Sequence, residues 1–316
     1  MQDPSGASRL QDMRLLGAFL CVFVVWGTNF LAIRYMVETI PPFMAMGVRS
    51  VVAGLILFWW ARLRGGGRPD ISEWKAAALV GTFFFLGAHG TLAWGETRVP
   101  SGIAALIMAT IPVWLVLLDW LGAKGKRPGL GVWLGLACGV AGLFVLTDPR
   151  TIEGTGSLVG ILVLAGSPPC WAIGSIIARG QPKNHPLTMI TGMQLIAGGI
   201  MLLILSIVAG EFSGFEVTAV SAKSLAGLVY TIVFGSVLTM TAYIWLLNVV
   251  SAAIVGTYAF INPMIAVAVG WAFAGEVVTP RVAVAGALIL LGVGIIFFTN
   301  QVARRTGTTR SYPIPR

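Results

Sequence analysis

The segment VVWGTNFLAIRYM, residues 24–36, shares its spacing of Trp and Arg with PPCWAIGSIIARG, residues 168–180. Trp26 and Trp171 are 145 positions apart, and so are Arg34 and Arg179, which follow them by eight residues. Both segments are apolar enough to lie in lipid, yet they contain hydroxyl, amide and guanidinium groups. Because such groups need a partner in protein or a water-filled cavity, the pattern predicts repeated membrane helices with an inward-facing polar side.

The repeat extends over nearly the whole chain. Its offset stays between 145 and 152 residues through five successive apolar runs, which chance matches would not produce. We therefore expect two homologous halves, residues 14–147 and 157–300, followed by a disordered cytoplasmic tail at 301–316. The further matching pairs are Pro41 and Pro186 at 145, Trp94 and Trp245 at 151, Pro112 and Pro263 at 151, and GLFVLTD (142–148) and GIIFFTN (294–300) at 152.

Composition sets the class of protein. Of the 316 residues, 57% are hydrophobic and 10% are charged, and the mean hydropathy is +0.87. Soluble domains are roughly 45–50% apolar and about 25% charged, so this chain is predicted to be an all-α integral membrane protein. A helix needs about 20 mostly apolar residues to cross a bilayer. The predicted spans are 14–37, 43–63, 73–94, 100–122, 129–147, 157–180, 187–209, 222–247, 251–273 and 279–300.

Ten spans in two halves of five determine the symmetry. The first half crosses the membrane an odd number of times, so the second half enters from the opposite side, as in the inverted repeats of secondary transporters. With cytoplasmic termini, fifteen Lys and Arg residues fall on the cytoplasmic side and five on the other, with Arg49 inside the second span. This bias favours a multi-pass protein of the plasma membrane with both termini inside.

Other classes of site find little support. The net charge of +9 arises from short loops between apolar runs, so the sequence predicts no nucleic-acid partner. Cys21, Cys138 and Cys170 lie inside apolar runs without a CxxC or Cys/His cluster, and neither a disulfide, a metal nor another cofactor is expected. The sequence contains no HExxH or GxSxG motif and no pair of midspan carboxylates, so it gives little support to an enzyme. It also contains no recognisable selectivity-filter sequence, so it gives little support to a channel.

Three stretches resemble the EamA-type repeat of the drug/metabolite transporter superfamily. WGTNFLAIRYMVETIPPFMAMGVRSVVAGLILF (26–58) is similar to the opening of such a repeat. VPSGIAALIMATIPVWLVLLDWL (99–121) and VSAAIVGTYAFINPMIAVAVGWAFAGEVVT (250–279) are similar to its fourth span. One departure is that Gly275 and Glu276 correspond to Gly125 and Lys126 in the first half, so a role for that carboxylate cannot be shared by both halves.

The resemblance implies two five-helix repeats in the inner membrane of a bacterium and the export of small metabolites. The YddG-like amino-acid exporter type is the favoured interpretation, with an aromatic or other neutral amino acid as cargo. Export of other metabolites or of hydrophobic cations is the alternative, and an intramembrane enzyme or a channel is less well supported. We expect alternating access around a midplane cavity, with the lipid bilayer and a small solute as partners and a monomer or weak dimer as the assembly.

Polar and aromatic residues in the middle of spans are the candidate solute-binding residues, because lipid would not accommodate them. Prolines near span centres are candidate hinges, although they can also act only as kinks. The predicted binding residues are Trp26, Asn29, Arg49, His89, Trp171, Ser175, Tyr243, Tyr258 and Asn262, and the predicted hinges are Pro112, Pro168 and Pro263.

Several roles stay open at this level. Arg49 lies too deep in its span to reach the interface easily, and it could either lock the structure through Glu38 or Glu96 or bind an anionic group. His89 could titrate near neutral pH or only donate a structural hydrogen bond. Arg34 and Arg179 are expected at opposite faces, where they could form gate or loop salt bridges. Gly and Ala residues in the fifth and tenth spans are expected to mediate close helix packing.

Overall fold

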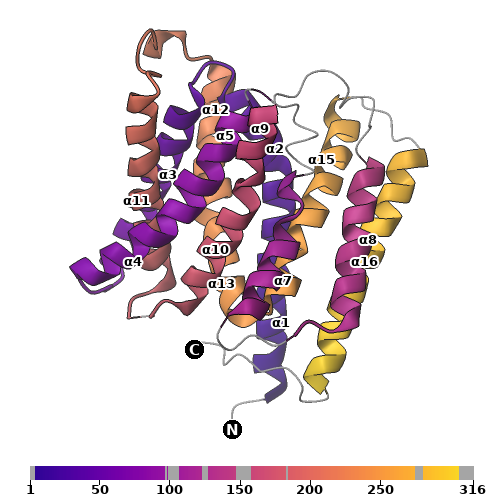
Figure 1. Ribbon diagram of the computed structural model, residues 1–316. Coiled ribbons are helices and arrows are strands. Elements are labelled where there is room, and N and C mark those ends of the chain that lie inside the picture. Colours follow the sequence, from indigo (N-terminus) through magenta and orange to yellow (C-terminus); the bar gives the residue numbers. More distant parts are fainter. Residues whose placement is uncertain are drawn as a thin grey trace.

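The computed structural model describes residues 4–96, 98, 107–122, 127–146, 158–182, 184–274 and 280–305. Throughout these ranges the regular structure is helical and includes no strand (Figure 1), which confirms the all-α prediction. By length and composition, six described helical segments can cross a membrane: Asp12–Ile33, Pro42–Leu63, Ile71–Gly95, Val159–Gly180, Leu187–Val208 and Ala222–Val249. Shorter apolar helices at Ile111–Leu121, Leu130–Gly142, Ala252–Ile265 and Ala283–Thr299 coincide with the other predicted spans.

The spans are numbered here in chain order, and several consist of consecutive helical segments. Span 1 comprises α1 (Pro4–Leu20), η1 (Cys21–Val25) and α2 (Trp26–Met36), span 2 is α3 (Pro42–Leu63), span 3 comprises α4 (Ile71–Gly81), η2 (Thr82–Gly90) and α5 (Thr91–Glu96), span 4 contains α7 (Ile111–Leu121), and span 5 is α8 (Leu130–Leu146).

The second half follows the same order. Span 6 comprises α9 (Leu158–Ala165) and α10 (Ser167–Gly180), span 7 is α11 (Leu187–Val208), span 8 comprises α12 (Ala222–Tyr230), η5 (Thr231–Leu238) and α13 (Thr239–Val249), span 9 comprises α14 (Ala252–Gly256) and α15 (Tyr258–Ala274), and span 10 is α16 (Pro280–Arg305). A short 3-10 helix, η4 (Val217–Ala219), lies between spans 7 and 8.

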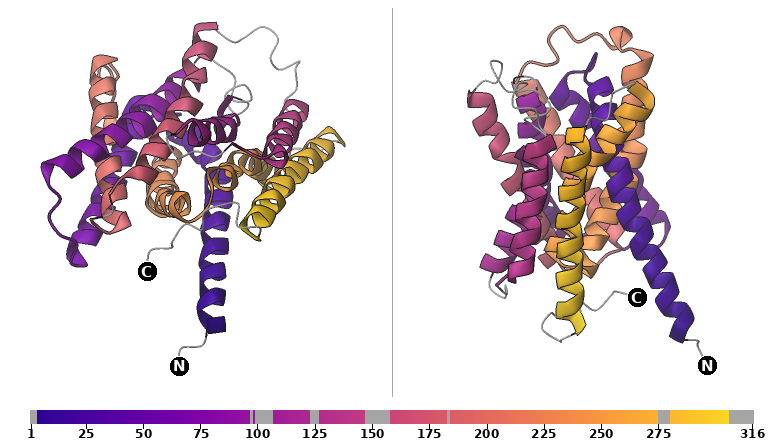
Figure 2. Two further views of the ribbon diagram at one scale, coloured as in Figure 1. Left: turned by 60° about the horizontal axis from the view of Figure 1, so that its bottom comes forward. Right: turned by 90° about the vertical axis from the view of Figure 1, so that its right-hand side faces the viewer.

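Two helix pairs form the sides of the molecule. The most extensive helix–helix contacts are those of α3 with α11 and of α8 with α16. Figures 1 and 2 show α8 and α16 together at one side and α3, α4 and α11 at the other, with α2, α7, α10, α13 and α15 between them. The spans with midspan aromatic and polar residues therefore occupy the centre.

Glycine pairs allow both side interfaces to form. A Cβ added at Gly54 would lie 2.7 Å from the carbonyl oxygen of Gly192, and one added at Gly192 would lie 2.9 Å from that of Gly54. Gly135 and Gly292 approach each other in the same reciprocal way, at 2.7 and 2.6 Å. The hydrophobic effect does not favour helix association within lipid, so membrane helices associate through close packing, which small residues allow.

The beginnings of helices are capped by local chemistry. Pro42 occupies the first turn of α3, where its missing N–H costs nothing. Glu211, just beyond α11, accepts hydrogen bonds from the backbone N–H groups of Phe43 and Met44 at 3.1 and 2.8 Å. This carboxylate at a helix N-terminus is also favoured by the helix dipole, and it ties span 7 to span 2.

The beginning of α1 and the end of α16 lie at the same end of the molecule (Figure 1). Span 10 is longer than predicted, because α16 continues to Arg305 where a disordered tail was expected from 301 onward. The remainder of the predicted tail, 306–316, lies outside the described residues.

Candidate solute-binding cavity

The central spans depart from regular α-helix where the predicted site lies. Segments η2 and η5 are π-helical, and η1 interrupts span 1 in the same manner. A π-helix shifts the hydrogen-bond ladder and frees carbonyl groups for other partners. Ser167 Oγ donates to the carbonyl of Ala88 at 2.8 Å, and Trp26 Nε1 donates to that of Gly235 at 3.1 Å. Side chains from spans 6 and 1 thus satisfy the π-helices of spans 3 and 8.

A cavity lies between these spans, with an empty volume of about 830 Å³ when its open part is included. Eight of the twelve predicted binding and hinge residues line it: Trp26, Asn29, Arg49, His89, Trp171, Tyr258, Asn262 and Pro263. The other lining residues were not predicted from the sequence, and they are Ile33, Phe85, Leu92, Met108, Ala109, Ile111, Leu195, Gly235, Ser236, Met240 and Ala259.

Aromatic rings form one wall. The ring centroid of Trp26 lies 5.6 Å from that of Trp171, 5.1 Å from that of Tyr243 and 5.0 Å from that of Tyr258. These tilted and edge-on arrangements are favourable for aromatic pairs. The tyrosine hydroxyl of Tyr243 accepts a hydrogen bond from Trp171 Nε1 at 2.9 Å and bonds to Ser175 Oγ at 2.7 Å.

Tyr243 and Ser175 do not belong to the cavity lining, although both were predicted as binding residues. Both are buried behind the ring of Trp171, and their hydroxyl groups bond to each other and to the Trp171 side chain or backbone. Ser175 follows Trp171 by four residues and therefore shares its helix face, but Ser175 lies one turn beyond the part of span 6 that lines the cavity. In this structure the pair orients the tryptophan instead of facing a solute.

The predicted hinge prolines differ in their positions. Pro263 lies inside α15 and lines the cavity. Pro112 and Pro168 lie in the first turns of α7 and α10, where span 4 turns at Thr110 and span 6 breaks at Gly166, and neither lines the cavity. They mark breaks between segments instead of kinks within one helix, because a proline in a first turn removes no helical hydrogen bond.

Amide and hydroxyl groups from spans 1, 8 and 9 also line the cavity. Asn262 donates through its amide nitrogen to the carbonyl oxygens of Tyr258, on its own span, and of Phe23, on span 1, each at 3.1 Å. These bonds hold its side chain between spans 9 and 1. Asn29 Oδ1 and Ser236 Oγ are buried and have no hydrogen-bond partner among the described residues. Buried polar atoms are usually paired, so these two are available to a bound molecule or to water.

Arg49 is 3% exposed, and its Nε and Nη1 atoms have no hydrogen-bond partner among the described residues. Its Nη2 lies 3.5 Å from Nδ1 of His89, at the limit of a hydrogen bond. The alternative of a structural lock with Glu38 is wrong, because Glu38 bonds to Lys223 Nζ at 2.7 Å. The side chain of Glu96, the other proposed partner, lies outside the described residues.

Arg179 joins three spans at the end of the molecule where the termini lie. It donates through Nη1 to Asp119 Oδ1 at 2.7 Å, through Nε to the carbonyl of Leu247 at 2.6 Å, and through Nη2 to that of Val250 at 3.1 Å. Spans 4, 6 and 8 are thereby connected, as a gate salt bridge would require. The side chain of its repeat counterpart, Arg34, lies outside the described residues.

The cavity itself lies toward the opposite end. Ile33 is near the end of α2, Arg49 is about two turns into α3, and Leu92 is near the start of α5. Since consecutive spans alternate in direction from the terminal end, all three residues lie in the half away from the termini. The Arg179 contacts lie between the cavity and the end of the molecule where the termini are.

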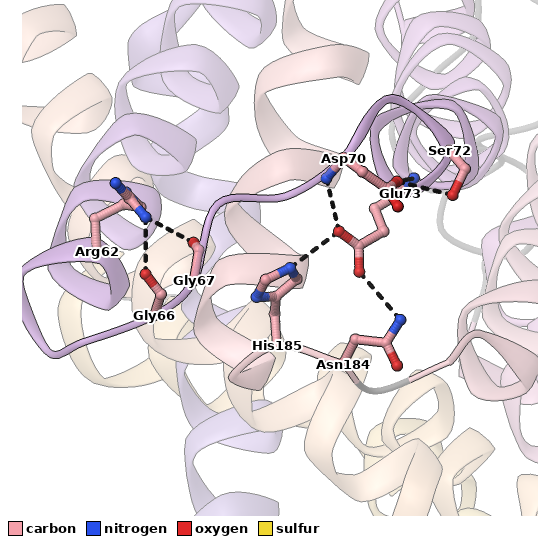
Figure 3. Close-up of polar contacts among 8 residues, drawn as sticks. All are labelled: Arg62, Gly66, Gly67, Asp70, Ser72, Glu73, Asn184 and His185. Carbon is pink, nitrogen blue, oxygen red and sulfur yellow. Dashed lines mark hydrogen bonds and ion pairs between the residues drawn. The ribbon is translucent and has the colours of Figure 1, made fainter.

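A second polar cluster lies near the loops between spans 2 and 3 and between spans 6 and 7 (Figure 3). Glu73 bonds to His185 Nε2 at 2.9 Å and to Asn184 Nδ2 at 3.2 Å. Asp70 and Glu73 form a capping box at the start of α4, and the hydrogen bond from the Glu73 amide holds the pKa of the Asp70 carboxyl below its ordinary value. In the described part of the chain, His, Cys, Asp and Glu residues form no group of three that could hold a metal ion.

The chain was compared with known proteins. The model of the EamA-like transporter family matches residues 14–148 and again 158–298. The chain is 34% identical to the uncharacterized inner membrane transporter YedA of Escherichia coli (strain K12) over 91% of this chain and 90% of YedA. It is 28% identical to Protein PagO of Salmonella typhimurium (strain LT2) over 92% of this chain and 94% of PagO.

A solved structure has a similar fold. That crystal structure superposes with a TM-score of 0.76 at 19% sequence identity, covering 92% of this chain and 98% of the other. At this level of identity the likeness concerns the fold alone.

Proposed function

Because this chain belongs to the EamA-like transporter family of the drug/metabolite transporter superfamily, we propose that it is a secondary transporter that exports amino acids by alternating access. The cavity lined by spans 1 to 4 and 6 to 9 is the observation that carries the proposal. Its lining includes Trp26 and Trp171 near the middle of spans 1 and 6, and substrate sites of secondary transporters are found at this depth. Transport of small solutes through a multi-pass membrane protein agrees with the relatives described above.

The contacts between helices support an inverted repeat. Span 6 packs against spans 3 and 4, and span 1 packs against the counterparts of those two, spans 8 and 9. Spans 2 and 7 pair with each other, as do spans 5 and 10, which is expected for elements beside a two-fold axis. The π-helices of spans 3 and 8 occur at matching positions, and η1 in span 1 matches the break at Gly166 in span 6.

Alternating access requires one end of the cavity to close while the other opens. The Arg179 contacts close the end near the termini, and the charge bias of the loops assigns that end to the cytoplasm. In our proposal this state has released its solute outward, and loading from the cytoplasm follows once the three Arg179 contacts break. No described midspan carboxylate is available for proton coupling, so the gradient of the solute itself can drive export.

The wall of the cavity favours a solute with an aromatic or other apolar part. Trp26, Trp171, Phe85 and Tyr258 provide ring faces and edges for such a group. The polar atoms of Asn29 and Ser236 and the charge of Arg49 can hold the polar ends of the same molecule. A hydrophobic cation is the alternative cargo, and the same rings would accept it.

Flux through proteoliposomes tests the proposal. The purified chain should carry saturable exchange of at least one amino acid, measured with a panel that includes nucleosides, sugars and quaternary amines. Trp26→Ala should raise the half-saturating concentration by about ten-fold or more, because about 1–3 kcal/mol of aromatic contact is lost. Trp59→Ala is the matched control, since Trp59 is exposed on α3 away from the cavity. Absence of saturable flux for every solute in the panel would overturn the proposal.

A further inference from the structure

The guanidinium of Arg49 is a buried charge without a counter-ion among the described side chains. Isolated charges in a low-dielectric interior are costly and normally have a partner. Among the described residues, its polar neighbour within hydrogen-bonding range is His89 Nδ1, at 3.5 Å, which carries no negative charge. In the part of the chain that the structure describes, no carboxylate therefore balances this positive charge in the cavity wall.

The ion pairs formed by the described side chains involve other residues. Asp119 bonds to Arg179, Glu73 to His185, and Glu38 to Lys223. Glu211 is used by the backbone amides at the start of α3 and by Ser206 Oγ at 2.7 Å. A role for Arg49 in locking two helices together by an ion pair finds no partner among these carboxylates.

The residue that corresponds to Arg49 in the second half of the chain is uncharged. The counterpart of Arg49 at the offset of 145 is Gln194, whose Nε2 donates to Gln181 Oε1 at 3.3 Å. Gln194 does not line the cavity, whereas its neighbour Leu195 does. The positive charge is therefore a feature of one half only, and symmetry provides no second site of this kind.

We infer that Arg49 binds the carboxylate of the transported solute, which makes the cargo an apolar or aromatic carboxylate and not a hydrophobic cation. The inference rests on the proposed function, because it assigns a chemical class to the solute of that same cavity. Carboxylate oxygens match the donor geometry of a guanidinium better than those of any other common solute group except phosphate. Arg49 Nε and Nη1 are the unpaired donors, and Phe85 and Trp171 line the same cavity as Arg49.

His89 acts as a positioning residue in this arrangement. Its Nδ1 faces Arg49 Nη2, and its ring lies between those of Phe85 and Trp171, with centroid distances of 5.4 and 5.5 Å. A neutral imidazole can accept from the guanidinium at Nδ1 and fix its direction without neutralising it. His89→Gln keeps an acceptor at this place, so we expect it to retain carboxylate affinity better than His89→Leu does.

Calorimetric binding to the purified full-length chain tests the inference with four related probes. L-Phenylalanine and 3-phenylpropionate carry a carboxylate, whereas L-phenylalaninamide and phenethylamine share the ring without one. The native protein should bind both carboxylates at least about ten-fold more tightly than the corresponding amide or amine. Arg49→Gln should remove most of that difference, and Arg49→Lys should restore part of it, because a charge remains without the planar fork.

Arg62→Gln is the matched control. Arg62 is on the same helix and donates to the carbonyl oxygens of Gly66 and Gly67, outside the cavity. Equal or tighter binding of phenethylamine by the native protein would overturn the inference without requiring any variant to fold. Carboxylate affinity that is unchanged in a folded Arg49→Gln protein would overturn it too.

Flux separates this inference from the proposed function. If native proteoliposomes carry saturable flux of some solute and Arg49→Gln leaves it unaltered, the carboxylate site is wrong and the transporter proposal stands. If no solute in the panel is carried, the transporter proposal itself fails.

Discussion

Replacement of Arg179 by glutamine should shift the protein toward the state that is open at the terminal end. The substitution removes the bonds to the carbonyl groups of Leu247 and Val250 and the ion pair with Asp119. Hydrogen bonds to a charged group contribute about 1.5 kcal/mol or more each. The ion pair adds less than about 1 kcal/mol, because the Asp119 side chain is 42% exposed and solvent screens it.

Since a glutamine can keep about one of these contacts, the net loss is about 2 kcal/mol. A difference of about 1.4 kcal/mol corresponds to a factor of ten, so the population open at the terminal end should rise by about 30-fold. The closed state loses all of this energy only if the three contacts are absent from the open state. That condition follows from the separation of spans 4, 6 and 8 that opening requires.

Accessibility of a buried thiol measures this population. Ala178 is buried on α10, one helical turn beyond Ser175 on the face of Trp171, and it lies beside Arg179. In a protein without the native cysteines, Ala178→Cys should react with an impermeant maleimide from the terminal side much faster after Arg179→Gln. Arg62→Gln, which also removes arginine bonds to carbonyl groups, should leave the rate unaltered. An unchanged or lower rate in the Arg179→Gln protein would refute the assignment of these contacts as a gate.

Two further predictions concern helix packing and capping. A methyl group at position 292 would lie 2.6 Å from the carbonyl oxygen of Gly135 and 2.8 Å from the amide nitrogen of Gly139, and these backbone atoms cannot move aside. Gly292→Ala should therefore lower the free energy of unfolding by about 1–3 kcal/mol in a thermal melt, whereas Gly294→Ala on the same helix, with nothing within 4 Å, should not. Equal melts for the two variants would show that α8 and α16 are not packed as described. Asp70→Ala should lower the melting temperature at neutral pH, because a hydrogen bond from the Glu73 amide lowers the pKa of the Asp70 carboxyl in the folded state. The contribution is complete above the unfolded pKa of about 3.9 and is lost as the pH falls through the lower folded pKa, so the two melting temperatures should converge at acid pH. Asp70→Asn keeps the cap without the charge, and a difference from native protein that does not depend on pH would contradict the reasoning.

Much of the candidate site could be predicted from polarity alone. Asn29, Arg49 and His89 line the cavity as expected, because amide, guanidinium and imidazole groups in the middle of a membrane span cannot face lipid. Apolar lining residues such as Phe85 and Met108 could not be identified in this way. Lipid and the wall of a cavity both accept an apolar side chain, so the sequence contains no signal that separates them.

One polar lining residue of span 8 was not predicted. Ser236 lines the cavity, whereas the predicted residue Tyr243 does not. Ser236 lies in η5, a π-helical segment in which the regular α-helical spacing does not hold. The sequence does not mark this segment, because a π-helix forms where carbonyl groups find partners on other helices, as that of Gly235 does in Trp26.

The sequence by itself determined that the chain is an all-α membrane protein with about ten apolar helices, because hydropathy along the chain depends only on the order of residues. Only the tertiary structure decided which carboxylates pair with which cations. It engaged Glu38 with Lys223 and Asp119 with Arg179, and it left Arg49 without a counter-ion among the described side chains. Those pairings depend on distances between helices that are far apart in sequence, and electrostatic energy depends on such distances and on burial, neither of which is written in the order of residues.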